Sequence, residues 1–105
     1  MNIQFKKGVL ELIVLLSVHN KDMYGYELMA EVSKVIDIND GTIYPLLKRL
    51  TNENYFETYL MESSEGPSRK YYKLTILGEK RMQELLMSWQ DFSKNVNQFI
   101  EECDK

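Results

Sequence analysis

The chain has 105 residues, of which 44% are hydrophobic and 28% are charged, and its formal net charge is −3. This length and composition predict one small domain with a thin core, and they exclude a disordered or low-complexity chain. A mildly acidic total does not exclude nucleic acid as a partner, because binding depends on where the cations lie rather than on their sum.

The chain lacks the residues that several classes of functional site require. Cys103 is the only cysteine and His19 the only histidine, so an internal disulfide and a Cys/His zinc site are excluded. With no glycine-rich phosphate loop either, we expect no enzyme activity, no cofactor and no metal. The apolar run Val9–Val18 is interrupted by Glu11 and is too short to span a bilayer. No secretory cleavage signal follows the N-terminus, so we expect no membrane association and a cytoplasmic protein.

The first half of the chain predicts two helices joined by a polar break. Residues 7–19 are apolar on nearly every face, which is typical of a helix that is mostly buried. Asp22 is expected to cap a second helix from about Met23 to Ile36. The apolar side of that helix is expected to contain Leu28, Val32, Val35 and Ile36.

The segment from Asp40 to Leu50 predicts a third helix, around which the rest of the chain is organised. Ile43, Leu46, Leu47 and Leu50 follow the spacing of one buried helix face. The other side carries hydroxyl, phenol, cationic and amide groups, which suit phosphate oxygens and base edges. These groups belong to Thr42, Tyr44, Lys48, Arg49 and Asn52. A helix that lies in a DNA groove has this character, although an ordinary amphipathic core helix shares the pattern.

The third helix can begin at either of two positions. If Asp40 caps it, Pro45 lies at the fifth helical position and removes the backbone hydrogen bond to Gly41. If Thr42 caps it, Pro45 falls in the first turn, where a missing N–H costs nothing. The Asp-Gly pair favours the start near Asp40. In both cases Tyr44 and Pro45 lie close to the positive end of the helix dipole.

The third helix is expected to end at Glu53-Asn54 and to lead into a β-hairpin. Residues 55–62 alternate as in a strand, residues 63–68 have a loop composition, and residues 69–75 predict the returning strand. A helix-turn-helix followed by a hairpin is a winged helix. Arg69, Lys70 and Lys73 would lie along a phosphate backbone, although lysines also protect solvated hairpin edges.

The last helix is expected to begin after Thr75 and to run from Ile76 to about Glu102. A helix of about 27 residues is about 40 Å long, which exceeds what so small a domain can cover. Its apolar residues alternate in steps of three and four, as in a coiled-coil seam, so a second copy of the chain is the simplest partner. The seam contains Met82, Leu85, Trp89, Phe92, Val96 and Phe99.

The fold class is therefore mainly α with a small β-hairpin (α+β). Residues 1–75 are expected to form a winged helix-turn-helix DNA-binding domain, and residues 76–105 a dimerisation helix.

With these motifs the chain resembles the PadR-like winged-helix transcriptional regulators, in the short branch that has a single C-terminal helix. The resemblance is carried by GTIYPLLKRL at 41–50, by GPSRKYYKLT at 66–75 with Gly78 three residues later, and by the long last helix. Asn54 departs from the glycine that is usual in the family, but it tolerates the same backbone conformation. The resemblance implies a homodimeric repressor that binds an inverted repeat in double-stranded DNA and is released by a small effector. The expected DNA-binding residues are Tyr24, Thr42, Tyr44, Pro45, Lys48, Arg49, Ser68, Arg69 and Lys70.

Trp89 and Phe92 form the expected effector site. Two copies of Trp89 would meet across a two-fold axis, and paired indole faces suit a flat aromatic molecule. Ser88-Trp89 also resembles a motif that stacks on planar drugs in short relatives, although a seam tryptophan can equally serve as dimer packing. The alternative function for the whole chain is a winged-helix protein-interaction module with a solvated basic wing and no specific DNA binding.

Overall fold

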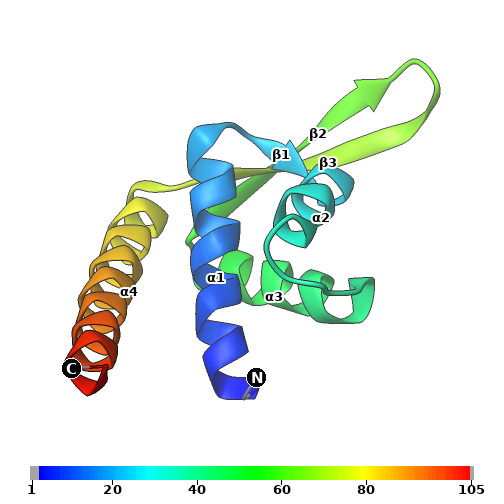
Figure 1. The fold of residues 1–105 in the computed structure, drawn as a ribbon. Coiled ribbons are helices and arrows are strands. Elements are labelled where there is room, and N and C mark those ends of the chain that lie inside the picture. The colour runs from blue at the N-terminus through cyan, green and yellow to red at the C-terminus, as the bar shows by residue number, and fades with distance from the viewer. Residues whose placement is uncertain (1–2, 105) are drawn as a thin grey trace.

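The computed structural model describes residues 3–104, with side chains from Gly8 onward (Figure 1). Four helices and a small antiparallel sheet follow one another along the chain, which confirms the winged helix predicted from the sequence. The elements are α1 (Ile3–Asn20), β1 (Met23–Tyr24), α2 (Gly25–Ser33), α3 (Asp40–Asn52), β2 (Phe56–Ser63), β3 (Gly66–Leu74) and α4 (Ile76–Cys103).

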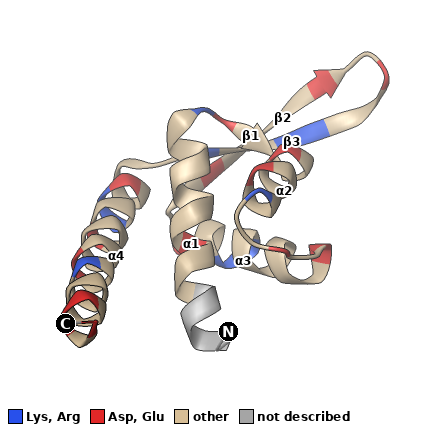
Figure 2. Cartoon of the chain, viewed as in Figure 1, with Lys and Arg blue, Asp and Glu red and all other residues tan. Residues whose placement is uncertain are grey.

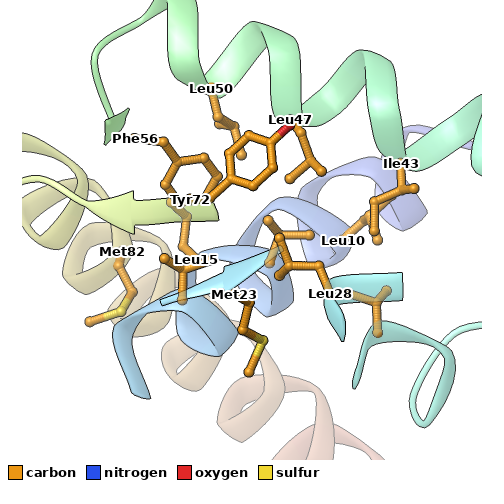
Figure 3. Packing of buried hydrophobic residues seen from close by; sticks show 13 residues of the cluster. Leu10, Leu15, Met23, Leu28, Ile43, Leu47, Leu50, Phe56, Tyr72 and Met82 are labelled. Carbon is orange, nitrogen blue, oxygen red and sulfur yellow. The ribbon is translucent and has the colours of Figure 1, made fainter. Parts of the chain in front are cut away.

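Helix α1 lies at the centre of the molecule, between α4 on one side and α2 and α3 on the other (Figure 1). Its buried residues include Leu10, Val14, Leu15 and Val18, so the prediction of a mostly buried first helix is confirmed. Every other element adds apolar side chains to the same core, and Figure 3 shows them meeting around α1. These side chains are Met23, Leu28, Val32, Ile43, Leu47, Leu50, Phe56, Tyr72 and Met82.

The sheet has the strand order β1-β3-β2 and contains one strand that the sequence did not predict. Met23 and Tyr24 pair with Tyr72 and Tyr71 of β3 instead of starting the second helix. A two-residue strand has no periodicity of its own, and only the presence of the β3 edge makes this pairing possible.

Helix α2 is shorter at both ends than expected. It begins at Gly25, where the carboxylate of Glu27 accepts a hydrogen bond from the Tyr24 N–H at 3.3 Å. Asp22 is therefore not the cap, which corrects the expectation from sequence. The helix ends at Ser33, and Val35, expected on the apolar side, lies exposed in the turn beyond it.

Helix α3 begins at Asp40, near the favoured position, but its N-cap is Asn39. The carbonyl oxygen of Asn39 accepts hydrogen bonds from Thr42 N–H at 3.0 Å and Ile43 N–H at 3.2 Å. Pro45 therefore lies inside the helix, not in a free first turn. At the other end Asn54 has a φ of 67°, and the Tyr55 N–H donates to the Leu50 carbonyl oxygen at 3.0 Å. This left-handed cap confirms the predicted end of the helix.

Thr75 caps α4 as predicted and also ties α4 to the end of α3. Its hydroxyl oxygen accepts from the Gly78 N–H at 2.9 Å, and the hydroxyl donates to the Asn54 carbonyl oxygen at 2.7 Å. The close approach explains Gly78, since a Cβ there would overlap the Tyr55 carbonyl oxygen. The first turns of α4 are thus fixed to the winged helix.

The wing is longer and more regular than the sequence suggested. Strands β2 and β3 extend to Ser63 and Gly66, so the predicted loop over 63–68 shrinks to a two-residue turn at 64–65. The hairpin projects away from the helices, on the side of the molecule opposite α4 (Figure 1). This separation places the wing and the free face of α4 at different ends of the domain.

Candidate nucleic-acid interface

Helix α3 buries one face and exposes the other, as its apolar spacing predicted. Ile43, Leu47 and Leu50 are fully buried, whereas Thr42, Tyr44, Pro45, Lys48 and Arg49 are exposed. The outward residues do not form one group. Tyr44 faces the start of α2 and strand β3, and Lys48 follows it one turn later on the same side of the helix, while Thr42 and Arg49 lie toward α1.

A hollow of about 380 Å³ lies where the start of α2, helix α3 and strand β3 meet. Its walls are aromatic rings with hydroxyl groups and two cationic side chains. The lining residues are Tyr24, Gly25, Tyr26, Tyr44, Arg69, Lys70 and Tyr72, which we call the tyrosine cleft. Of the residues expected to bind DNA, the fold thus brings together Tyr24, Tyr44, Arg69 and Lys70, from three separate segments of the chain.

Tyr44 closes this cleft by lying over Gly25. A Cβ built on Gly25 would be 2.8 Å from both the Cε1 atom and the hydroxyl oxygen of Tyr44, so the ring position requires a glycine there. Burial raises the pKa of the adjacent Tyr72, and the nearby Tyr44 raises it further. Both causes favour the neutral phenol, so Tyr72 keeps its hydroxyl hydrogen to a higher pH than an ordinary tyrosine does.

The cationic groups of Arg69 and Lys70 lie over tyrosine rings at the mouth of the cleft. The Cζ atom of Arg69 lies 4.7 Å from the centroid of the Tyr24 ring, and the Nζ atom of Lys70 lies 6.0 Å from that of Tyr72. Such cation–π contacts hold a charged group in place without neutralising it. Figure 2 shows this basic segment of β3 beside β1 and α2, whereas acidic residues lie toward the tip of the hairpin.

The outer face of the sheet carries a row of tyrosines that braces the wing. Tyr71 lies between Tyr24 and Tyr59, with ring centroids 5.5 Å from each. The Tyr59 hydroxyl donates a hydrogen bond to the Asp22 carboxylate at 2.7 Å, and this bond is the main cause that raises the pKa of Tyr59 to about 12. The hairpin is therefore tied to the segment that leads into α2.

Arg49 and its neighbours lie outside the tyrosine cleft. Thr42, Pro45 and Arg49 border a second hollow of about 260 Å³ together with Leu10 and Leu46. The guanidinium of Arg49 is paired with Glu53 at 3.1 Å and with Glu11 at 3.5 Å. Partial burial lowers the pKa of Arg49, but the hydrogen bond to Glu53 and the charges of Glu11 and Glu53 outweigh it and raise the pKa overall. Sequence reasoning did not foresee the pair with Glu11, because Glu11 is remote from Arg49 in the chain.

Three residues of the tyrosine cleft were not among the expected DNA-binding residues: Gly25, Tyr26 and Tyr72. A partial signal existed for the first two, since a glycine between two tyrosines at a helix start favours close approach of another segment. Tyr72 had no such signal, because its alternation in β3 indicated only a core residue. Ser68, which was expected, lies exposed on β3 just beyond Arg69 and does not line the cleft.

At the other end of the domain, α4 exposes a run of large apolar side chains. Trp89, Phe92, Val96 and Phe99 are all exposed, and the rings of Trp89 and Phe92 lie 6.5 Å apart between centroids. Met82 differs from the expectation that it lies in this seam. It is 2% exposed and belongs to the core of its own chain, because the first turns of α4 pack against the winged helix. Leu85 is half-buried against the same core.

A shallow hollow of about 230 Å³ connects this apolar run with α1. Gly8, Val9 and Leu12 line it from α1, and Leu85, Ser88, Trp89 and Phe92 line it from α4. The two expected effector residues, Trp89 and Phe92, therefore share one concave surface with the exposed edge of α1.

Two other kinds of site are absent from the described part of the chain. Residues 3–104 contain no cluster of three His, Cys, Asp or Glu residues that could hold a metal ion. None of the helices described is both long and apolar enough to cross a membrane.

Comparisons with known proteins identify the arrangement. The model of the transcriptional regulator PadR-like family matches residues 14–84. An uncharacterised protein of Lysinibacillus sphaericus is 33% identical over 99 residues, which cover 90% of this chain and 91% of that protein. The crystal structure of a PadR-like transcriptional regulator from Bacillus cereus is 39% identical and has a TM-score of 0.83, covering 92% of this chain and 96% of the other.

A PadR-like transcription factor from Bacteroides fragilis is 37% identical with a TM-score of 0.78, covering 91% of this chain and 94% of the other. The family match extends from the middle of α1 through the tyrosine cleft and the wing to the first turns of α4. The chain therefore belongs to the PadR-like family of transcriptional regulators and is a DNA-binding regulator of transcription rather than an enzyme.

Proposed function

We propose that the protein is a homodimeric repressor that binds an inverted-repeat operator and is released from it by a small planar aromatic molecule. The observation that carries the DNA part of this proposal is the tyrosine cleft. Tyr44 from α3 and Arg69 and Lys70 from β3 meet there beside the N-terminal end of α2. Phenol hydroxyls, two cations and the positive end of a helix dipole together suit a DNA backbone and the adjacent base edges.

The proposed DNA contacts fall into two kinds, those to phosphate oxygens and those to base edges. Arg69 and Lys70 are held on tyrosine rings and remain charged, so they suit phosphate oxygens of the DNA backbone. Tyr44 and Lys48 point outward from α3 and suit base edges in the major groove. The N-terminal end of α2 at Gly25 also borders the cleft, and the positive end of its helix dipole suits one further phosphate. The wing would then follow the neighbouring strand.

Dimerisation through α4 supplies the second half-site. Trp89, Phe92, Val96 and Phe99 form an exposed apolar run that proteins seldom leave in contact with water. A second copy of α4 would cover this run and set the distance between two α3 helices. In this proposal residues 1–75 bind DNA and residues 76–105 form the dimer. Because Met82 is buried in its own chain, the interface begins after it, near Leu85.

The effector part rests on the hollow between α1 and α4. Trp89 and Phe92 present aromatic faces beside the apolar residues Val9 and Leu12. A flat aromatic molecule that stacks on Trp89 would lie between the subunits and change their separation. Since both half-sites must be engaged together, such a change would lower the affinity for the operator.

Selection of bound fragments from genomic DNA tests this function directly. We expect recovery of sequences with two-fold symmetric half-sites, bound by a dimer as judged by the mass of the complex. Expression of a reporter behind a recovered site in the cytoplasm should fall when the protein is present. Recovery of no enriched sequence, with only weak and salt-sensitive binding to all duplexes, would instead favour a protein-interaction module.

A further inference from the structure

Glu11 is the one charged residue that is buried among residues 8–104, and its carboxylate faces two different helices. Its side chain is 8% exposed and lies on α1 between the core residues Leu10 and Leu12. Oε2 of Glu11 is 3.5 Å from Nη2 of Arg49 on α3, and Oε1 is 3.4 Å from Nε of Arg81 on α4. One buried carboxylate is thus shared by α3 and α4.

Stability alone does not explain this arrangement. A buried ion pair gains little over an apolar side chain of similar size, because desolvation offsets the Coulomb attraction. Removal of one partner is costly, however, because the remaining charge is then buried without compensation. The strength with which Glu11 holds one arginine must therefore depend on whether the other arginine is in place.

Arg49 is free to change partners. Its guanidinium is 48% exposed, and it already contacts the exposed carboxylate of Glu53 at 3.1 Å. It stands on the outward side of α3, one turn beyond Pro45 and beside the second hollow. A DNA phosphate can compete with Glu53 for this half-exposed cation, since ion pairs between exposed groups are weak.

We propose that Glu11 is a positioning residue that couples α4 to DNA binding, by holding Arg49 away from DNA unless Arg81 shares its charge. This inference rests on the proposed DNA-binding function of α3. With Arg81 in place the carboxylate is partly neutralised, and Arg49 is available to a phosphate. When α4 shifts on α1 and Arg81 withdraws, the whole charge of Glu11 acts on Arg49 and DNA affinity falls.

Glu11, Arg49 and Arg81 form a charged triad, which lies next to the hollow in which an effector would bind. Gly8 is one helical turn before Glu11 on α1, and Leu85 is one turn after Arg81 on α4, and both line that hollow. A molecule that separates α1 from α4 there would lengthen the contact between Arg81 and Glu11 first. The signal would then reach α3 through a single charged group.

Two substitutions with opposite expected signs test this coupling. Arg81→Met should lower affinity for a fluorescein-labelled duplex about fivefold more than Lys80→Met, which removes the same charge from an exposed neighbour on α4. Glu11→Gln should raise affinity above that of Glu84→Gln, its charge-matched control. Arg81→Met should also reduce the slope of the salt dependence by about 0.9 per protomer, as expected for the loss of one phosphate contact.

The double variant Glu11→Gln/Arg81→Met distinguishes coupling from a purely structural role, because only coupling makes the effect of Arg81→Met on DNA affinity depend on Glu11. In the Glu11→Gln background, Arg81→Met should affect binding no more than Lys80→Met does. Two outcomes would overturn the coupling. In the first, both single variants lose affinity in proportion to the decrease in their melting temperature. In the second, Arg81→Met keeps its full effect on binding in the Glu11→Gln background. Arg81→Lys retains the charge and should bind like the wild type, which keeps the test valid if Glu11→Gln fails to fold.

The same titrations separate this inference from the proposed function. Wild-type protein that binds neither the random duplex at low salt nor any selected operator contradicts the DNA-binding role of α3, and the coupling with it. Wild-type protein that binds DNA, with variants indistinguishable from their charge-matched controls, contradicts the coupling alone.

Discussion

Gly25 and Tyr44 are in mutual contact, although they belong to different helices and are 19 positions apart in sequence. The ring of Tyr44 occupies the space in which any other residue at position 25 would carry its Cβ, at 2.8 Å from Cε1 and from the hydroxyl oxygen. The glycine at the start of α2 therefore determines where the proposed DNA-reading tyrosine of α3 stands.

Gly25→Ala should displace the Tyr44 ring while leaving the fold intact. The obstructing atoms are the far end of a half-exposed side chain, and alanine favours the first turn of α2. We expect a loss of about 1–3 kcal/mol in operator binding with little change in melting temperature. In a Tyr44→Ala background, Gly25→Ala should have almost no further effect. Additive losses would show that Gly25 acts independently of Tyr44.

Arg69→Ala should weaken binding to all DNA sequences alike. Its guanidinium is held on the Tyr24 ring at the mouth of the tyrosine cleft, which suits a phosphate contact, so the salt slope should fall by about 0.9 per protomer. Tyr44→Ala should instead cost about 1–3 kcal/mol more on the operator than on random duplex. Lys80→Ala, which removes an exposed cation from α4 outside the cleft, is the control. If Arg69→Ala and Tyr44→Ala both bind as the wild type does while circular dichroism is unchanged, this surface does not bind DNA.

Phe99→Lys should produce a folded monomer without operator affinity. Phe99 is 67% exposed and lies outside the core of its own chain, so a lysine there leaves that core intact and places a charge in the dimer seam. Ile76→Lys is the matched control, because Ile76 is 89% exposed at the start of α4 and precedes the seam. Sedimentation should give a dimer for the control and a monomer for Phe99→Lys. A dimer in both variants would place the interface elsewhere.

Planar cationic dyes should quench the fluorescence of Trp89, the only tryptophan in the chain. The indole lies in the hollow between α1 and α4, so stacking should be saturable, with about one dye per dimer. Trp89→Ala should abolish dye binding and leave the protein dimeric. A chemically varied panel of dyes that produces no quenching would leave Trp89 with a packing role in the dimer.

The Tyr59–Asp22 hydrogen bond should make stability decrease in alkaline solution. The pKa of Tyr59 is raised from an ordinary value near 10 to about 12, so the folded state favours the neutral phenol. This contribution is complete below about pH 10 and is lost as the pH rises toward about 12. Urea unfolding between about pH 9 and pH 12 should show the decrease in the wild type and in the Tyr26→Phe control. Tyr59→Phe should show a smaller decrease, and an equal one would exclude this bond as its source.

The sequence alone determined the helices, the hairpin and the family, because these depend on local pattern. The spacing of Ile43, Leu47 and Leu50 requires a buried face whatever lies opposite, and Asn54 and Thr75 end and begin helices through their own backbone and side-chain preferences. The aromatic run in α4 likewise indicated a surface in need of a partner.

Tertiary structure decided what depends on contacts between distant segments. Met23 and Tyr24 form a strand only because β3 offers an edge, and Met82 leaves the seam because α1 and the sheet enclose it. Arg49 and Arg69 are equally basic in the sequence. In the fold, Arg49 is paired with a buried carboxylate from α1, whereas the guanidinium of Arg69 lies over a tyrosine ring and keeps its charge. The charge that is available to a ligand depends on such neighbours, and only the folded chain provides them.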